Sequence, residues 1–194
     1  RMRKMDLNPK YGHLIERVMY NSLLSSTDLT GKAFFYENPL EIALEEYGRE
    51  VTASPTDKER LPITQRLEVF GCSCCPPNIN RFFAELGDVI AFAGNETLYI
   101  EQYVSSDVNT SLGRVEIREN YALSGKAEIS SQNFSGKKLA VRLPEWSNKL
   151  VATSMGKPVK YEVEEGYAYF DAEKSFSLQL DFGIKAAFVA ANPK

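Results

Sequence analysis

The first half of the chain contains two stretches in which apolar residues recur every three or four positions. Between Tyr11 and about Ser26 they fall at Tyr11, Leu14, Ile15, Val18, Met19 and Leu23. This spacing places them on one side of an α-helix, so it predicts an amphipathic helix with a buried face. Pro9 lies just before the helix, where a proline is tolerated, and residues 27–31 supply the turn formers that end it.

A second helix is predicted after two consecutive prolines, Pro76 and Pro77. Prolines are tolerated in the first turn of a helix because the amide hydrogens there have no partner within the helix. Apolar residues continue with helical spacing at Ile79, Phe82, Phe83, Leu86, Val89 and Ile90, and Gly94 is placed to end the helix. Between the two helices, residues 45–66 are polar and contain prolines and a charged run, which indicates a solvated loop.

From Thr97 onward the period of the apolar residues changes to two. Short segments rich in β-branched and aromatic residues alternate with the turn pairs Ser124-Gly125, Ser135-Gly136, Met155-Gly156 and Glu165-Gly166. We expect strands at 98–104, 113–121, 126–130, 137–143, 149–153, 159–163, 167–171, 176–182 and 184–189. This pattern predicts an antiparallel β-sandwich, and therefore an α+β chain with two domains, 1–95 and 96–194.

Composition and charge narrow the class of protein. The 194 residues include 23 lysines and arginines against 26 aspartates and glutamates, so the net charge of -3 gives no basic surface for nucleic acid or for anionic lipid. No apolar run approaches the roughly 20 residues of a membrane-spanning helix, and no signal peptide is recognisable. Reduced, clustered cysteines favour a cytoplasmic location, although a metal or burial could protect thiols in a periplasm.

All three cysteines, Cys72, Cys74 and Cys75, lie within four positions, directly ahead of the second predicted helix. The free amide hydrogens and the dipole of a helix N-terminus favour thiolates at Cys74 and Cys75. Thiolates are preferred zinc ligands, but a closed zinc site needs four ligands and the single histidine, His13, is distant in the sequence. Three interpretations stay open: inert buried thiols, part of a metal site completed by other residues, or a strained disulfide between Cys74 and Cys75.

The segment from Phe70 to Asn78, which reads Phe-Gly-Cys-Ser-Cys-Cys-Pro-Pro-Asn and is followed by Arg81, resembles glycoside hydrolase family 127, the β-L-arabinofuranosidase family. The resemblance extends back through Tyr11, Glu16-Arg17, Tyr20-Asn21 and residues 34–40, and forward to Ala191-Asn192-Pro193. It implies that residues 1–95 are the C-terminal helices of an (α/α)6 barrel, which the β-sandwich follows. It also implies a retaining glycoside hydrolase that acts on an arabinose-containing glycoside.

The resemblance assigns roles to individual residues. Cys74 matches the catalytic nucleophile and a zinc ligand, and Cys75 matches a second zinc ligand. Tyr36 matches a substrate-contacting tyrosine, with packing against the barrel wall as the simpler alternative. Cys72 has no assigned role, and Val69 stands where the family often has a tryptophan.

Other parts that the resemblance implies are not found in this sequence. A glutamate and a third cysteine that complete the zinc site, and the acid/base glutamate, lie upstream of the position that matches Arg1. We therefore expect a fragment truncated at both ends, with an incomplete zinc site and no activity by itself. Apolar helix faces left open by an incomplete barrel predict a homodimer. The alternative function is a noncatalytic β-sandwich module that binds carbohydrate or protein.

Several residues receive structural interpretations. His13 is expected to be a partly exposed or hydrogen-bonded helix residue rather than a ligand, and Trp146 is expected to anchor the core at a strand end rather than stack on a sugar. Arg66 and Arg81 are candidates for orienting the cysteine motif, with a structural role as the default. The carboxylates Glu37, Glu41, Glu45 and Glu46 are expected to form a solvated face.

Overall fold

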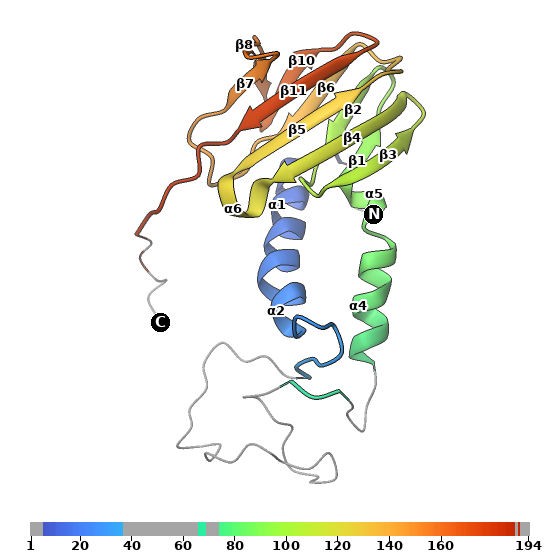
Figure 1. Ribbon diagram of the computed structural model, residues 1–194, viewed down its shortest axis with the longest axis vertical. Coiled ribbons are helices and arrows are strands. Elements are labelled where there is room, and N and C mark those ends of the chain that lie inside the picture. The colour runs from blue at the N-terminus through green and yellow to red at the C-terminus, as the bar shows by residue number, and fades with distance from the viewer. Residues whose placement is uncertain (1–5, 37–65, 69–73, 189, 191–194) are drawn as a thin grey trace. The chain divides into compact units, whose positions relative to one another are not determined.

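The computed structural model describes residues 6–36, 66–68, 74–188 and 190. It contains helices and two β-sheets (Figure 1). The chain divides into two compact units, Arg1–His13 with Gly87–Lys194, and Leu14–Leu86. The domain boundary expected between residues 95 and 96 stays a prediction. Cys72, the four glutamates named above and nearly all of the predicted 45–66 loop lie outside the described residues.

The first predicted helix is present, in three consecutive parts. It consists of α1 (Pro9–Val18), a π-helical turn η2 (Met19–Leu23) and α2 (Leu24–Ser26). Its apolar face is covered only in part, because Gly12 and Met19 are buried whereas Leu14 is 59% exposed and Val18 is 40% exposed. The expectation of a buried face is therefore correct for one part of this helix and wrong for another. No helix in the described part of the chain is long and apolar enough to cross a membrane.

The second predicted helix is shorter than expected. It forms α4 (Cys75–Ala84), and after Glu85 and Leu86 a separate turn, α5 (Gly87–Ile90), follows. The chain then enters a strand, β1 (Ala91–Ala93), which pairs with β2 (Thr97–Ile100). Gly94 therefore lies in the turn between two strands, where its amide donates to the Thr97 carbonyl oxygen, and does not end the helix. The apolar residues with helical spacing end at Ile90, where α5 ends as well, so only the helix end predicted at Gly94 was wrong.

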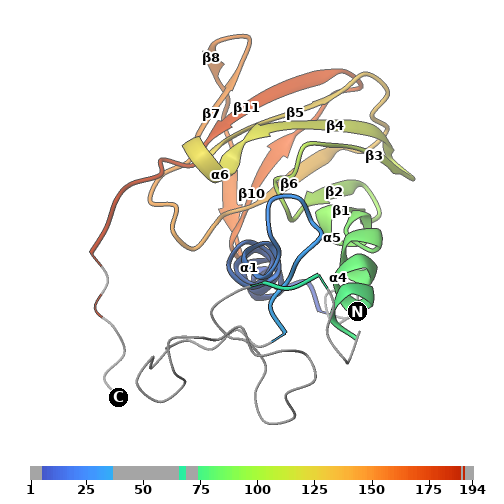
Figure 2. The ribbon, with the colours of Figure 1, turned by 60° about the horizontal axis from the view of Figure 1, so that its bottom comes forward.

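The predicted β-sandwich is present, and its two sheets face each other in Figure 2. One sheet has the order β1, β2, β6 (Lys138–Arg142), β10 (Tyr167–Asp171) and β9 (Glu162–Glu164). The other has the order β3 (Ser106–Thr110), β4 (Gly113–Asn120), β5 (Lys126–Ser131), β11 (Phe176–Asp181), β7 (Val151–Ser154) and β8 (Lys157–Pro158). A short helix, α6 (Tyr121–Ser124), joins β4 to β5.

Three details of the sandwich correct the sequence-based expectation. The sheets are mostly antiparallel, but β2 and β6 pair in parallel, because β3, β4 and β5 lie between them in the sequence and belong to the other sheet. The strand expected at 98–104 ends at Ile100, and β3, which was not predicted, begins at Ser106. Residues 184–188, expected to be part of a strand, are irregular and Phe188 is fully exposed.

The core of the sandwich is built from alternate residues of facing strands. Val115, Ile117 and Ile129 of the six-stranded sheet, and Leu98, Ile100, Leu139 and Val141 of the five-stranded sheet, are at most 1% exposed. Each such side chain stabilises the fold by about 1.5–3 kcal/mol relative to an exposed position. At one end, Trp146 lies 5.5 Å from the Tyr121 ring and 6.3 Å from the Phe182 ring, which confirms its expected role as a core anchor.

Two of the predicted turn pairs form hairpins of minimal length. Met155-Gly156 joins β7 to β8, and Glu165-Gly166 joins β9 to β10, in each case with a positive φ at both residues. This is the backbone geometry that suits the twist of a two-residue hairpin, and glycine adopts it without steric strain.

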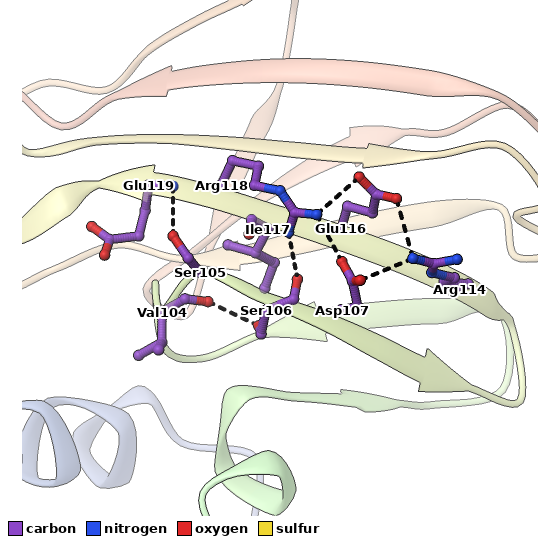
Figure 3. A network of polar contacts seen from close by, with 9 residues as sticks. All are labelled: Val104, Ser105, Ser106, Asp107, Arg114, Glu116, Ile117, Arg118 and Glu119. Atoms are coloured by element: carbon purple, nitrogen blue, oxygen red, sulfur yellow. Dashed lines mark hydrogen bonds and ion pairs between the residues drawn. The ribbon is translucent and has the colours of Figure 1, made fainter.

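The outer edge of the six-stranded sheet carries a ring of alternating charges. Asp107 of β3 contacts Arg114 and Arg118 of β4 at 2.9 Å and 3.0 Å, and both arginines also contact Glu116 (Figure 3). Hydrogen bonds from Arg118 first, and then from Arg114, lower the pKa of Asp107. Charged side chains on an edge strand disfavour pairing with the edge of another sheet, and Asp107 is such a side chain on β3.

Candidate active site

The cysteine motif begins helix α4, as the sequence predicts. Cys74 is the N-cap residue, Cys75 is the first residue of the helix, and Pro76 and Pro77 lie in the first turn. The two prolines remove amide hydrogens that would have no partner within the helix, so they begin the helix at little cost. Both thiol groups are thereby fixed at the N-terminal end of α4.

The two thiols are reduced and close together. Cys74 is exposed and Cys75 is half-buried, and neither forms a disulfide. Their sulfur atoms lie 3.9 Å apart, so the strained disulfide considered from the sequence is absent. Two sulfurs held by one tetrahedral zinc ion, at about 2.3 Å each, would be about 3.8 Å apart. The observed pair therefore fits two ligands of a zinc site.

The remaining ligands of such a site are not gathered in the described part of the chain. No group of three or more histidine, cysteine, aspartate or glutamate side chains that could hold a metal ion occurs among the described residues. His13, as expected, is a hydrogen-bonded helix residue, because its Nδ1 atom lies 2.6 Å from Nη1 of Arg142. Two thiols alone leave a tetrahedral zinc ion two ligands short.

Two residues of α4 support the backbone of Cys74. The Asn78 side-chain amide donates a hydrogen bond of 2.8 Å to the Cys74 carbonyl oxygen, and Arg81 donates to the Asn78 Oδ1 atom. Arg81 therefore contacts the motif through Asn78, and its role as a residue that orients the motif stays a prediction beside the structural default. Asn78 lies four residues after Cys74 and three before Arg81, a spacing that places all three on one side of a helix and could have indicated this support of the Cys74 backbone from the sequence.

Arg66 has a structural role in the described residues. Its guanidinium donates to the Ser25 carbonyl oxygen at 2.6 Å and lies 4.4 Å from the centroid of the Phe35 ring. It follows that Arg66 ties the end of α2 to the extended segment at Phe34, which forms isolated bridges to Thr27 and to Leu67. Tyr36 lies half-buried two residues beyond Phe34. Contact of Tyr36 with a substrate stays a prediction.

Among the hollows in the described part of the sandwich are two that the cysteines and Tyr36 do not line. One, of about 530 Å³, lies over polar side chains of the six-stranded sheet, among them Arg118, Glu128 and Gln179. The other, of about 430 Å³, lies between Leu139, Phe170 and Leu178. Neither is a pocket around the thiols. The alternative function, a noncatalytic module that binds carbohydrate or protein, stays a prediction.

Comparison with known proteins identifies one family over both parts of the chain. The family model for the β-L-arabinofuranosidase GH127 catalytic domain matches residues 1–88, and the model for the GH127 middle domain matches residues 97–182. The non-reducing end β-L-arabinofuranosidase of Bifidobacterium longum subsp. longum is 28% identical over 203 residues, which cover 98% of this chain and 30% of the relative.

Solved structures give the same result. A GH127 β-L-arabinofuranosidase from Geobacillus stearothermophilus T6 is 28% identical with a TM-score of 0.79, covering 99% of this chain and 31% of that one. A second solved structure, a GH127 β-arabinofuranosidase, shares the fold with a TM-score of 0.71. It is 23% identical to this chain, and the match covers 93% of this chain and 29% of that one. The chain thus spans about 30% of the length of the relatives that it matches.

Proposed function

The chain belongs to glycoside hydrolase family 127, and on this premise we propose that it carries the nucleophile of a retaining β-L-arabinofuranosidase. The observation that supports the proposal is the pair of reduced thiols, Cys74 and Cys75, at the start of α4. Helix α4, which carries the pair, and helices α1 and α2 are proposed to be part of an (α/α)6 barrel. The substrate is proposed to be a glycoside with a terminal arabinofuranosyl unit.

The proposed reaction has two steps, each centred on Cys74. The Cys74 Sγ atom attacks the anomeric carbon, the bond from that carbon to the leaving oxygen breaks, and the leaving oxygen takes up a proton from an acid outside this chain. Water then attacks the same carbon, gives one proton to the group that acted as the acid in the first step, and breaks the bond from that carbon to sulfur, which returns the thiolate. Because each step inverts the anomeric centre, the configuration is retained overall.

The chain contributes orientation as well as the nucleophile. Asn78 and Arg81 hold the carbonyl group of Cys74, and with it the backbone from which the thiol projects. Zinc, when held by Cys74, Cys75 and further ligands, would keep the attacking sulfur deprotonated. Tyr36 is proposed to contact the sugar.

The proposal is tested in a longer protein that contains this chain together with the upstream part of the catalytic domain. Cys74→Ala is expected to lower kcat on an aryl β-L-arabinofuranoside by about a thousandfold or more, the order of loss seen when a nucleophile is removed. Cys75→Ser, the matched variant, is expected to lose bound zinc together with activity. A Cys74→Ala protein that keeps a tenth of the original kcat would contradict the assignment.

The isolated chain is a second test of the same proposal. We expect it to release no arabinose from the same glycoside, because the described residues provide two thiols but no third metal ligand beside them. Measurable release of arabinose by the 194-residue chain would overturn this expectation.

A further inference from the structure

A group of buried polar side chains lies at one end of the five-stranded sheet. Arg142 ends β6 and is paired with Tyr167, the first residue of β10, while Glu101 directly follows β2. All three residues are 0% exposed. A buried charge destabilises the fold strongly unless its charge and hydrogen-bonding atoms are matched by partners. The buried guanidinium of Arg142 therefore needs hydrogen-bond acceptors and a negative charge close to it.

The sheet provides part of these contacts. Arg142 donates through Nε to the Glu101 carbonyl oxygen at 2.7 Å, and the Tyr167 hydroxyl donates to Oε1 of Glu101. The guanidinium lies 6.0 Å from the centroid of the Tyr103 ring, whose hydroxyl donates to the Arg142 carbonyl oxygen. One carboxylate and one guanidinium thus share a fully buried site at the ends of strands β2 and β6.

The start of helix α1 closes this site. Gln102 donates through Nε2 to the Gly12 carbonyl oxygen at 2.9 Å, and a Cβ atom added to Gly12 would lie 2.5 Å from both Arg142 Cδ and Glu101 Oε2. The helix backbone therefore rests directly on the arginine and the carboxylate. Glycine at position 12 allows this close approach because it has no side chain.

His13 completes the closure through a contact that depends on its protonation state. Its Nδ1 atom lies 2.6 Å from Nη1 of Arg142. A guanidinium has only donors, so Nδ1 must accept, and the imidazole must be neutral with its hydrogen on Nε2. A second proton on His13 would replace this hydrogen bond by two cations in contact.

We propose that His13 and Arg142 form a pH-sensitive latch that holds the start of α1 on the five-stranded sheet. In neutral solution the latch is closed by the hydrogen bond from Arg142 to His13. As the pH falls, the imidazole takes up a proton, the two cations repel each other, and the first turns of α1 open more often from the sheet.

Other charged groups lie on the sheet and on the same helix as His13. From the sheet, the Glu101 carboxylate is already engaged with Tyr167 and borders the guanidinium of Arg142. On its own helix, Glu16 and Arg17 follow His13 by three and four residues. Lys10 precedes His13 by three residues and pairs with Asp6. The contact of Arg142 with His13 is direct, at 2.6 Å, so the charge of Arg142 acts directly on the proton affinity of the imidazole.

The sign of the pH dependence follows from the favoured form. The contact with Arg142 favours the neutral form of the His13 imidazole in the folded chain. His13 therefore takes up a proton at a higher pH in the unfolded chain than in the folded chain. The stabilisation by the latch is therefore complete above the ordinary titration range of histidine, near pH 6.5, and is lost as the pH falls below it.

The test uses the fact that His13 is the single histidine of the chain. Its imidazole resonances in a proton NMR spectrum need no assignment, and they can be followed through a pH titration of the folded chain and of the chain unfolded in urea. We expect a midpoint at least about one pH unit lower in the folded chain, which is a tenfold difference in proton affinity. Equal midpoints would overturn the latch.

Amide hydrogen exchange supplies the second readout, with His13→Gln as the matched variant. The glutamine side-chain oxygen can accept from Arg142 at every pH, so it keeps a partner without the titration. Between about pH 7.5 and pH 5.5, where histidine titrates, protection of the α1 amides should fall about tenfold in the original chain and stay within about twofold in the variant. An equal loss in both proteins would refute the role of His13.

Discussion

Gly12 lies inside helix α1, where a glycine ordinarily lowers stability by about 1 kcal/mol relative to alanine. Its position is explained by the surface on which the helix rests. A Cβ atom there would lie 2.5 Å from Arg142 and from Glu101, both fully buried and held by hydrogen bonds. The gain in helix propensity is therefore outweighed by the overlap with side chains that cannot move aside.

We predict that Gly12→Ala destabilises the chain by about 1–3 kcal/mol, the usual effect of overpacking a buried position. Gly87→Ala in α5 is the matched control, because a Cβ atom added there would have no neighbour within 4 Å. Urea unfolding followed by circular dichroism measures both. Equal stabilities of the two variants would show that the close approach at Gly12 does not constrain the fold.

At the scale of an element, the edge strand β3 is joined to β4 by ion pairs whose strength depends on pH. Its Asp107 side chain, 42% exposed, joins two arginines of β4 and has a lowered pKa, chiefly because Arg118 and then Arg114 donate hydrogen bonds to it. A carboxyl group with a lowered pKa stabilises the folded state above its ordinary titration range. That stabilisation is lost as the pH falls through the lower, folded-state value.

The corresponding prediction concerns acid sensitivity. Asp107→Asn should reduce the dependence of stability on pH below about pH 4, because the variant has no carboxyl group at the centre of the ring to protonate. The change is expected to be small, since exposed ion pairs contribute little. The pH dependence is measured as the midpoint of urea unfolding between about pH 5 and pH 3. Asp171→Asn, at the end of β10, is the control. An unchanged pH dependence in Asp107→Asn would contradict it.

At the scale of the whole molecule, the helices of the Leu14–Leu86 unit present apolar side chains to solvent. Leu14 is 59% exposed, Leu24 44%, and Val18 and Phe83 40% each. Exposed apolar groups on neighbouring helical turns favour association, because burying them removes apolar area from water.

We therefore predict that the isolated chain self-associates, with homodimerisation through these helices. Leu14→Glu should shift the molecular mass measured by light scattering toward that of the monomer. Leu29→Glu is the control, since Leu29 is fully exposed in the turn after α2 and lies off the helix. A monomeric original chain at high concentration, or the same shift in both variants, would count against the prediction.

Much of the fold could be predicted from the sequence because its signals are local. Apolar spacing identified the helix from Tyr11 onward, period two identified most strands, and Met155-Gly156 and Glu165-Gly166 identified two hairpins. The candidate site was local as well: two thiols and two prolines within four positions define the start of α4. The family resemblance drew on the same short motif, and the family matches agree with it.

The rest was decided by residues far apart in the sequence. The parallel pairing of β2 with β6 and the strand Ala91–Ala93 depend on which strand lies alongside, and helical spacing alone could not show either. The contact between His13 and Arg142 joins residues 129 positions apart.

The amino-acid sequence by itself therefore determined the presence and the starts of the two main helices, most strands, two hairpin turns and the position of the two thiols, because each depends on interactions between near neighbours. The tertiary structure alone decided the order of strands and the partners of each buried charge. Arg142 lies in the strand predicted at 137–143, and the sequence does not show that it is fully buried, with Glu101, Tyr167 and the start of α1 around it. The partners that compensate the buried charge of Arg142 are distant in the sequence, so they surround it only once the chain has folded.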